Sequence, residues 1–263
     1  MLLFDYADES YGTGTFRRHI HIKATSSTCI KGYLEDEPHA FSVELQHDQS
    51  KITSIEATWV RHPTSTCPGA IDKLKELEGA PLSSNPLDIR AFSDSKSHCT
   101  HFFDLTALMI THAYNTNRST KSSDIGTVFF YTMAITDEAN GLSTARLNLN
   151  GKELQYWSMK HGTIESPSHL KGQNPMMGMT SWAKDKLSVQ EISEVLCLQK
   201  AIFVATGRRF KLNELQGANC KEVGQPIGQC YAMRDGREEE SIRIGKRIDF
   251  TNTPEDMLQF IDP

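Results

Sequence analysis

The chain has 263 residues, of which 38% are hydrophobic and 23% charged, enough to bury a core in one large domain or two smaller ones without disulfides or metals. A net charge of -5 and a pI near 6.1 argue against nucleic-acid binding, which needs a clustered basic surface. The sequence has no apolar run of membrane-spanning length, and its start, MLLFDYADES, lacks the basic and apolar regions of a secretory signal. We therefore expect a cytoplasmic globular protein with no nucleic-acid or membrane partner.

The cysteine pattern points to free thiols rather than to a disulfide or zinc framework. The six cysteines are widely spaced in a long chain, and no CxxC pair occurs. Zinc-ribbon and thioredoxin-like interpretations are therefore excluded, and reduced thiols are expected. The cysteines are Cys29, Cys67, Cys99, Cys197, Cys220 and Cys230.

Strand-like alternation of apolar and polar residues dominates the first sixty residues. Four segments show it, each bounded by turn-forming residues: 16–24, 29–36, 40–48 and 52–60. Successive short strands with brief connections predict an antiparallel β-meander.

The pattern becomes helical after Pro63. A Cys67-Pro68-Gly69 corner precedes a helix that we expect to end at Gly79, a residue suited to a helix C-terminus. A second, more apolar helix is expected over about residues 100–114. The polar stretch 115–124 that follows it is the best candidate for an internal boundary.

The second half repeats the order of strands followed by helix. Strands are expected at 126–136, 144–151 and 152–160, with Asn150-Gly151 as a two-residue hairpin turn. Ser188 and Glu191 form a capping-box pattern that opens the longest helix, 188–209. The basic cluster at its end is interpreted as complementing the helix dipole, and the Gly-rich tail from Leu212 offers only short strand-like pieces such as SIRIG. That cluster consists of Arg208, Arg209 and Lys211.

These elements predict an α+β fold in which antiparallel β-meanders pack against a few helices. We expect residues 1–120 to form a sheet with two helices that carry the Cys67 and Cys99 corners. Residues 121–263 then supply a second set of strands, the long helix and an irregular tail, and the two parts form one compact unit. The sequence leaves the oligomeric state open between a monomer and a homodimer.

The segment SHCTHFFDL, residues 97–105, concentrates chemically useful side chains at a predicted helix start. Helical spacing places His101, Asp104 and His112 on one side, while apolar residues cover the rest. A helix this apolar is mostly buried, so its polar stripe needs hydrogen-bonding partners or a ligand.

A second segment, VRHPTSTCPGA at residues 60–70, offers complementary groups. Arg61 and His62 close a strand, and Cys67 opens the next helix through a Pro-Gly corner whose amides can face an anion. We expect Cys67 and Cys99, each at a helix N-terminus, to share one pocket. A helix N-terminus also lowers the pKa of a thiol.

These segments resemble a known family. HIHIKA, VRHPTSTCPGA, LEGAPL, SHCTHFFDLTALMITHA, TSWAKDKL and ATGRRF look like a bacterial family of unknown function, DUF2889, over roughly residues 15–210. The family brings no assigned reaction, but its context implies catabolism of aromatic or otherwise hydrophobic compounds.

The order of elements is also similar to the NifU-type iron–sulfur scaffold fold, in which two helix-opening cysteines converge. The chain lacks the additional cysteine of that scaffold, so the resemblance concerns the fold and the position of the pocket, and it does not imply cluster assembly.

Simpler roles compete with a functional one at each position. Cys67 and Cys99 can be ordinary buried thiols, and His101 with Asp104 can be an exposed ion pair of the first helical turn. His19 and His21 share one face of a strand, where they can ligate a metal with His101 or simply face solvent.

The leading hypothesis is a cofactor-independent lyase or isomerase that acts on a small, aromatic or hydrophobic, partly anionic molecule. His101 is the expected acid or base, Asp104 orients it, and Cys67 or Cys99 can act as nucleophile or acid. The expected substrate contacts are Arg61, His62, Thr100 and His112, with Arg61 either gripping an anionic group or forming a surface ion pair.

Two other functions remain open. One is a non-catalytic small-molecule-binding or accessory protein that uses the same pocket. The other is a metal site built from Cys67, Cys99, His101 and His62, whose soft and borderline ligands suit zinc. The leading hypothesis requires no cofactor and no metal.

Overall fold

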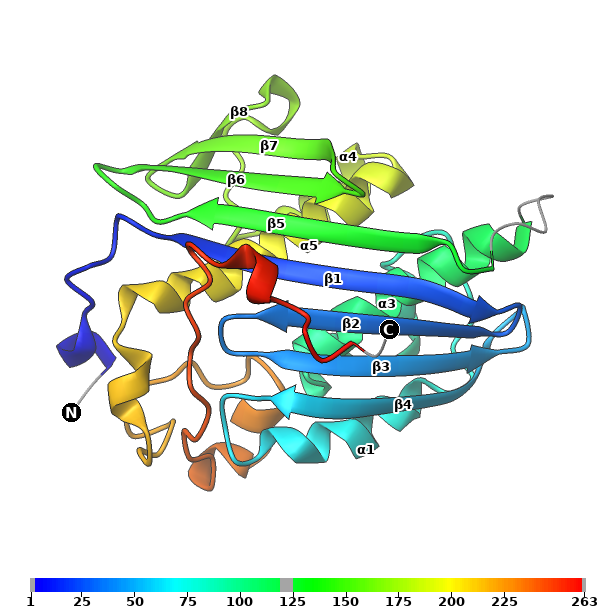
Figure 1. Ribbon diagram of the computed structural model, residues 1–263, viewed down its shortest axis with the longest axis horizontal. Helices are drawn as coiled ribbons and strands as arrows, with labels where there is room; N and C mark the ends of the chain where they lie inside the picture. The colour runs from blue at the N-terminus through cyan, green and yellow to red at the C-terminus, as the bar shows by residue number, and fades with distance from the viewer. Residues whose placement is uncertain (1–2, 119–124, 262–263) are drawn as a thin grey trace.

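A computed structural model describes residues 3–118 and 125–261 of the chain, and its central feature is one eight-stranded antiparallel sheet (Figure 1). The strand order is β4-β3-β2-β1-β5-β6-β7-β8, and the predicted α+β class is confirmed. The strands are β1 (Thr15–Ser26), β2 (Cys29–Asp36), β3 (Ala40–His47), β4 (Ile52–Arg61), β5 (Val128–Thr136), β6 (Leu142–Leu149), β7 (Lys152–Lys160) and β8 (Thr163–Ser166).

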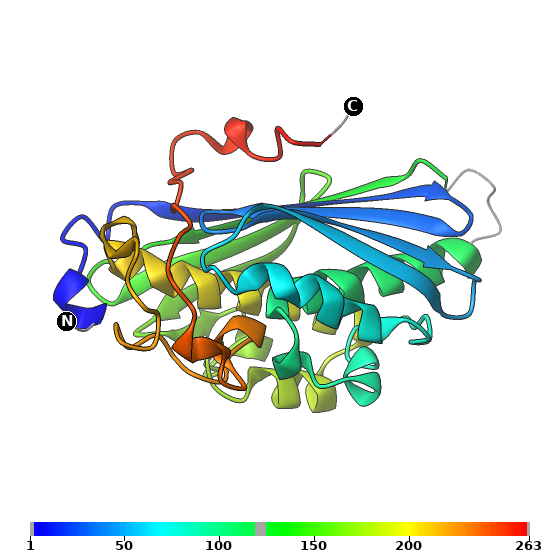
Figure 2. The same ribbon diagram turned by 90° about the horizontal axis from the view of Figure 1, so that it is seen from below.

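The helices cover one face of this sheet, and the C-terminal segment crosses the other face (Figure 2). The longest two, α3 and α5, pack against the first and second halves of the sheet respectively. The α-helices are α1 (Ala70–Leu74), α2 (Ile89–Phe92), α3 (Thr100–Arg118), α4 (Met179–Lys186) and α5 (Val189–Ala205). None of the helices in the described ranges combines the length and the apolar character needed to cross a membrane.

The two halves of the chain follow the same plan and meet at their first strands. Each half makes a four-stranded meander before its helices, and β1 pairs with β5 from Thr15↔Thr136 to Lys23↔Val128. The sheet is therefore continuous across the predicted division at residue 120. Most of the expected boundary stretch, residues 119–124, lies outside the described residues.

Local sequence signals set most of the element ends. The side chain of Ser188 accepts from the backbone N–H of Glu191, and the reciprocal bond completes the predicted capping box of α5. Asn150 and Gly151 have φ values of 49° and 80°, as a two-residue hairpin turn requires. The helix predicted before Gly79 is shorter than expected, because α1 continues as a tight 3-10 turn, Lys75–Leu77.

Alternation along β1 separates the two faces of the sheet. Arg18 and Ile20 point to the helix-covered face, where they line a cavity together with His101. His19 and His21 lie on the opposite face and contact the ring of Phe130. The possibility that these two histidines join His101 at a metal is therefore wrong.

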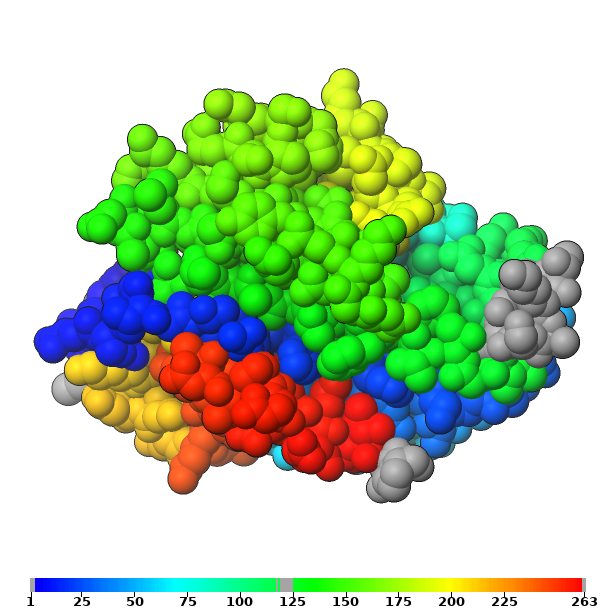
Figure 3. Space-filling model, turned by 45° about the horizontal axis from the view of Figure 1, so that its top comes forward, coloured from blue at the N-terminus to red at the C-terminus, as the bar shows by residue number. Residues whose placement is uncertain are grey.

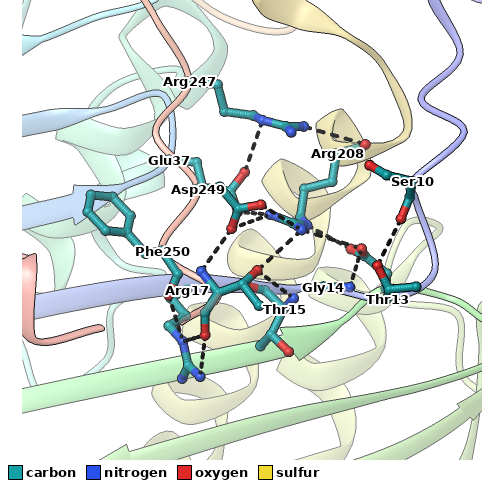
Figure 4. A network of polar contacts seen from close by, with 12 residues as sticks. Ser10, Thr13, Gly14, Thr15, Arg17, Glu37, Arg208, Arg247, Asp249 and Phe250 are labelled. Atoms are coloured by element: carbon teal, nitrogen blue, oxygen red, sulfur yellow. Dashed lines mark hydrogen bonds and ion pairs between the residues drawn. The ribbon is translucent and has the colours of Figure 1, made fainter. Parts of the chain in front are cut away.

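Arg208 does more than complement the helix dipole, the role that the sequence predicts for it. Its side chain is only 6% exposed and forms ion pairs with Glu37, Asp137 and Asp249 (Figure 4). Arg247 belongs to the same network, with its Nε 3.5 Å from Oε2 of Glu37. This network ties the turn after β2 to the end of α5 and to the C-terminal segment.

The C-terminal segment lies across the outer face of the sheet, over the first strands (Figure 3). Phe250 packs under the guanidinium of Arg61, Phe260 contacts the ring of Tyr33, and the backbone N–H of Leu258 donates to Glu35. The expected strand-like piece SIRIG makes only isolated bridges, Thr64↔Arg243 and Asn219↔Ile242.

The Arg208 network makes the stability of the fold depend on pH through Glu37. Burial raises the pKa of Glu37 to about 7 from its usual 4.5, although Arg208 and Arg247 lower it. A carboxyl whose pKa is raised on folding stabilises the protein below its unfolded pKa and loses that contribution as pH rises. We expect the free energy of unfolding to fall by up to about 3 kcal/mol from this group between pH 4.5 and 7.

Urea unfolding at pH 5 and pH 8 measures this contribution, and Glu37→Gln should remove it from the difference between the two pH values. Glu153→Gln, at an exposed position of β7, is the matched control and should behave like the unaltered protein. An unchanged pH dependence in Glu37→Gln would contradict the assignment.

Candidate functional site

The candidate site begins with a buried ion pair between neighbouring strands. Arg18 of β1 donates from Nε and Nη2 to Oδ2 of Asp36 at the end of β2, at 3.0 and 2.6 Å. Their side chains are 2% and 0% exposed. Burial alone would raise the pKa of Asp36, but the charges of His39 and Arg18 outweigh it, and the net shift is downward. The carboxylate is therefore ionised.

The other oxygen of Asp36 orients His39. Asp36 Oδ1 accepts from the backbone N–H of His39 and lies 2.9 Å from its Nδ1. Since the carboxylate can only accept, Nδ1 carries a proton, and in the neutral form of the ring the lone pair is on Nε2. Arg61 holds the turn in place by donating from Nη2 to the backbone carbonyl oxygen of Asp36 at 2.6 Å.

His101, from the first turn of α3, stacks on His39. The ring centroids are 3.9 Å apart and the planes differ by 34°. Within the described residues, the buried Nε2 of His101 has no hydrogen-bond partner. Burial lowers the pKa of His101 well below its usual value, and the charges of His39 and Arg18 lower it further, so the ring is neutral at pH 7.

Both histidines line a cavity of about 90 Å³ together with three cysteines, Cys67, Cys99 and Cys230. This cavity, which we call the thiol cavity, brings together the two helix-opening cysteines that the sequence places in one pocket. Tyr231 forms part of its wall and approaches the Cys-Pro-Gly corner closely: a Cβ on Gly69 would lie 2.6 Å from its hydroxyl. The corner therefore needs glycine for close packing.

The thiols are not activated in the way that the sequence predicts. Burial raises the pKa of Cys67 to about 11, although a hydrogen bond with Thr64 opposes the shift. Burial also raises the pKa of Cys99, and it outweighs the backbone N–H groups of Phe102 and His101 at the start of α3. The helix N-terminus lowers the pKa as expected, but desolvation is the larger effect.

A second, smaller cavity of about 40 Å³ reaches His101 from the other side, between α3 and α5. An open groove of about 220 Å³ lies next to it, because Arg90, Asp104 and Lys200 line both. Lys96 also lines this groove, which we call the cationic groove. Cationic side chains therefore lie between the groove and the cavity at His101.

The expected orientation of His101 by Asp104 is wrong. Asp104 instead forms ion pairs with Lys200 at 3.1 Å and with Arg90 at 3.9 Å. The carboxylate close to His101 is that of Asp36, because the candidate ligand atoms of Asp36, His39 and His101 lie within 4.8 Å of one another. Asp104 shares a helix face with His101, but α5 supplies a cation that binds it more directly.

Arg61 does not line either cavity, and its guanidinium is occupied by Glu35 at 2.9 Å and by backbone carbonyl groups. It is a positioning residue for the turn, and the cations that line the groove are instead Arg90, Lys96 and Lys200. His62 bonds through Nδ1 to the carbonyl of Thr64 and does not line the thiol cavity. The possible metal ligand His62 is thus replaced by His39.

The remaining two predicted contacts lie elsewhere. Thr100 lines the cationic groove. His112 lies two to three turns further along α3, where its Nε2 is 2.9 Å from the hydroxyl of Tyr131 in a different cavity. The predicted polar face of α3 is therefore continuous, but its residues line separate cavities.

Asp36 and His39 are not recognisable as site residues from the sequence, because they flank a short turn between strands, where polar residues usually need no further explanation. Lys200 is not recognisable either, because a single lysine in an otherwise apolar helix normally reaches solvent. The spacing of Asp36 and His39, three residues apart across a turn and followed by a strand, is the only local signal that the two can interact.

The cluster can hold a cation as well as exchange protons. Asp36, His39 and His101 offer one carboxylate oxygen and two imidazole nitrogens, a donor set suited to Zn²⁺ or Fe²⁺. The guanidinium of Arg18 occupies the second oxygen of Asp36 and would lie beside such an ion. Proton exchange requires no rearrangement of this pair, whereas a metal bound through His39 Nδ1 would require that nitrogen to lose its proton.

One family model matches part of the chain. Residues 22–115 match the model of a family described as a protein of unknown function, DUF2889, which confirms the resemblance over a shorter range than expected. The matched range contains Asp36, His39, Cys67, Cys99 and His101. No curated protein and no solved structure gave a match, so the similarity to the NifU-type scaffold is not supported.

The raised thiol pKa values predict slow alkylation in the folded protein. At pH 7 the thiolate fraction of Cys67 should be about a hundredfold smaller than that of an unperturbed thiol, and the rate should rise about tenfold per pH unit up to pH 10. Mass spectrometry after timed iodoacetamide treatment measures this rate. The same chain in denaturant is the control, and equal rates in the two states at pH 7 would refute the assignment.

Proposed function

We propose that the protein is a cofactor-independent enzyme that moves a proton on a small anionic molecule with an apolar body, as an isomerase or a lyase. The observation that carries the proposal is the pair of buried histidines in ring contact, one of them oriented by an ionised aspartate, between the thiol cavity and the cationic groove. Titratable groups held in unusual surroundings at the end of a cavity are typical of active sites.

His39 is the proposed base. Asp36 fixes its tautomer, so that Nε2 can accept a proton while the carboxylate stabilises the imidazolium that forms. His101 keeps a catalytic role as a neutral N–H donor to an oxygen on which negative charge develops. Its lowered pKa suits that role, because a neutral imidazole can donate a hydrogen bond without first being protonated.

The proposed substrate enters by the cationic groove, and its reacting carbon passes His101 to reach His39 in the thiol cavity. Lys200 and Arg90 provide charge-assisted hydrogen bonds for a carboxylate or phenolate, with Asp104 as their counter-ion when no substrate is bound. The walls between the groove and His101 are largely apolar and include Leu108 and Leu196. This combination favours an aromatic or aliphatic molecule with one anionic end.

The proposed step is balanced without an external reagent. His39 Nε2 takes a proton from a carbon beside a carbonyl or carboxylate group, and the C–H electron pair forms a new carbon–carbon double bond as charge moves to the oxygen held by His101. The imidazolium then returns the proton to a different carbon in an isomerase, or to a departing oxygen in a lyase. The thiols of Cys67, Cys99 and Cys230 remain protonated and shape the cavity.

Deuterium exchange tests the base directly. The protein is incubated in D₂O with a panel of small aryl- and alkyl-substituted keto and unsaturated carboxylic acids, and proton NMR records exchange at carbon. Exchange should fall by about a hundredfold or more in His39→Gln and His101→Gln, the usual contribution of acid–base catalysis, while each variant keeps a cooperative unfolding transition. Losses smaller than about tenfold in both variants would reject the mechanism.

The groove is tested by the kinetic constants. Lys200→Met should raise KM about tenfold with little change in kcat, because it removes one charge-assisted contact that ground state and transition state share. Lys184→Met, at an exposed position of α4, removes the same charge and should leave both constants unchanged. An equal fall of kcat and kcat/KM in Lys200→Met would instead place the lysine at the reacting atoms.

A metal site is the second candidate, favoured by the mutual 4.8 Å proximity of the ligand atoms of Asp36, His39 and His101. It is separated from the first by zinc titration of protein freed of metal with a chelator. One equivalent bound in the native protein, and none in Asp36→Asn or His101→Gln, would support the metal site. Exchange activity that survives the chelator would support acid–base catalysis, and ligand binding without exchange would support a non-catalytic binding protein.

A further inference from the structure

A larger cavity of about 640 Å³ lies at the opposite end of the α3–α5 helix pair. Its walls come from the C-terminal half of α3, the N-terminal half of α5, and strands β5, β6 and β7. It shares only Leu108 and Ser193 with the cavity that reaches His101. Its volume is typical of sites for small organic ligands, which run from about 300 to 1,000 Å³.

Glu194 is the only charged side chain among the described residues that line this cavity. Its carboxylate accepts hydrogen bonds from Gln155 Nε2 at 2.7 Å and from Gln190 Nε2 at 3.2 Å, both neutral amides. Residues 3–118 and 125–261 provide no lysine, arginine or histidine ion pair for it. A carboxylate that is only 9% exposed is costly to bury without a cation, so this group calls for a positively charged partner.

Neutral aromatic rings form the wall beside this carboxylate. His112 stacks on Phe129 with centroids 3.8 Å apart, and its Nε2 lies 2.9 Å from the hydroxyl of Tyr131. Burial lowers the pKa of His112 to about 4 and raises the pKa of Tyr131, so both are uncharged at pH 7. Aromatic faces attract cations, and apolar side chains such as Leu149 and Leu154 complete the wall.

We propose that this cavity is a binding site for a small organic cation, a primary or methylated amine on an aromatic or aliphatic body. The ammonium group pairs with Glu194, and the body lies against Phe129, Tyr131 and Leu154. We name the space the amine cavity. It is distinct from the cationic groove, whose lysines and arginine select ligands of the opposite charge.

The structure also provides a reporter for ligands near Glu194. The indole N–H of Trp157 donates to Gln155 Oε1 at 3.1 Å, and Gln155 in turn donates to Glu194. A cation that draws the carboxylate toward it changes this chain of hydrogen bonds. The indole signal in a proton–nitrogen NMR spectrum, assigned with Trp157→Phe, therefore reports binding in this cavity and not in the cationic groove.

The test uses three probes of similar size and different charge: 2-phenylethylamine, 2-phenylethanol and 3-phenylpropionate. We expect the amine to bind at least about tenfold more tightly than the alcohol and to shift the Trp157 indole signal, with no such shift from the carboxylate. Glu194→Gln should abolish the preference for the amine. Glu153→Gln, which removes the same charge from an exposed site on the adjoining β7, should retain it.

A second variant keeps the test decisive if Glu194→Gln fails to fold. Val189 lines the cavity at the first turn of α5 and is 39% exposed, so Val189→Trp can fill the entrance without disturbing the core. It should abolish amine binding with Glu194 still present. The proposal is overturned if wild-type protein binds the alcohol as tightly as the amine, if no amine binding is detected at millimolar concentration, or if Val189→Trp binds the amine normally.

Discussion

The ionised carboxylate of Asp36 is the constraint on which the candidate site depends. It is fully buried, so both of its oxygens must be matched by donors, and Arg18 and His39 supply them from the neighbouring strand and from the following turn. Removing Arg18 would leave a buried charge unpaired, a change that typically costs about 3 to 5 kcal/mol. The same bonds that satisfy the charge hold the His39 ring where His101 can stack on it, so stability and site geometry share one cause.

That turn is also held from the outer side of the sheet. Arg61 bonds the backbone carbonyl of Asp36 and pairs with Glu35, whose other oxygen accepts from the backbone N–H of Leu258 in the C-terminal segment. Phe250 covers the guanidinium of Arg61. Segments more than two hundred residues apart thus fix the turn from Asp36 to His39, and these contacts hold the irregular C-terminal segment over the outer face of the sheet (Figure 2).

Much of the fold could be predicted because its determinants are local: strand alternation, the Ser188 capping box and the Asn150-Gly151 turn all act within a few residues. The convergence of Cys67 and Cys99 could also be predicted, because each opens a helix after the same sheet. The position of His39 in the site could not be predicted, because its contact with His101 joins a turn to a distant helix. The sequence predicts lowered pKa values for Cys67 and Cys99, whereas the pKa values of both thiols are raised. Depth of burial is a property of the whole fold, and here its effect on the pKa outweighs that of the helix N-terminus.

The cavity that reaches His101 and the amine cavity owe their opposite charges to one antiparallel helix pair, α3 and α5. The start of α3, with His101, faces the Lys200 end of α5, while His112, further along α3, faces the Glu194 end. Six residues of helix, about 9 Å, separate Glu194 from Lys200. Leu108 and Ser193 line both cavities, so the ends of the same two helices present a positive and a negative environment to neighbouring spaces. Under the two proposals, a ligand would be sorted by its charge, because a mismatched charge would have to be desolvated against a like charge in a largely apolar space.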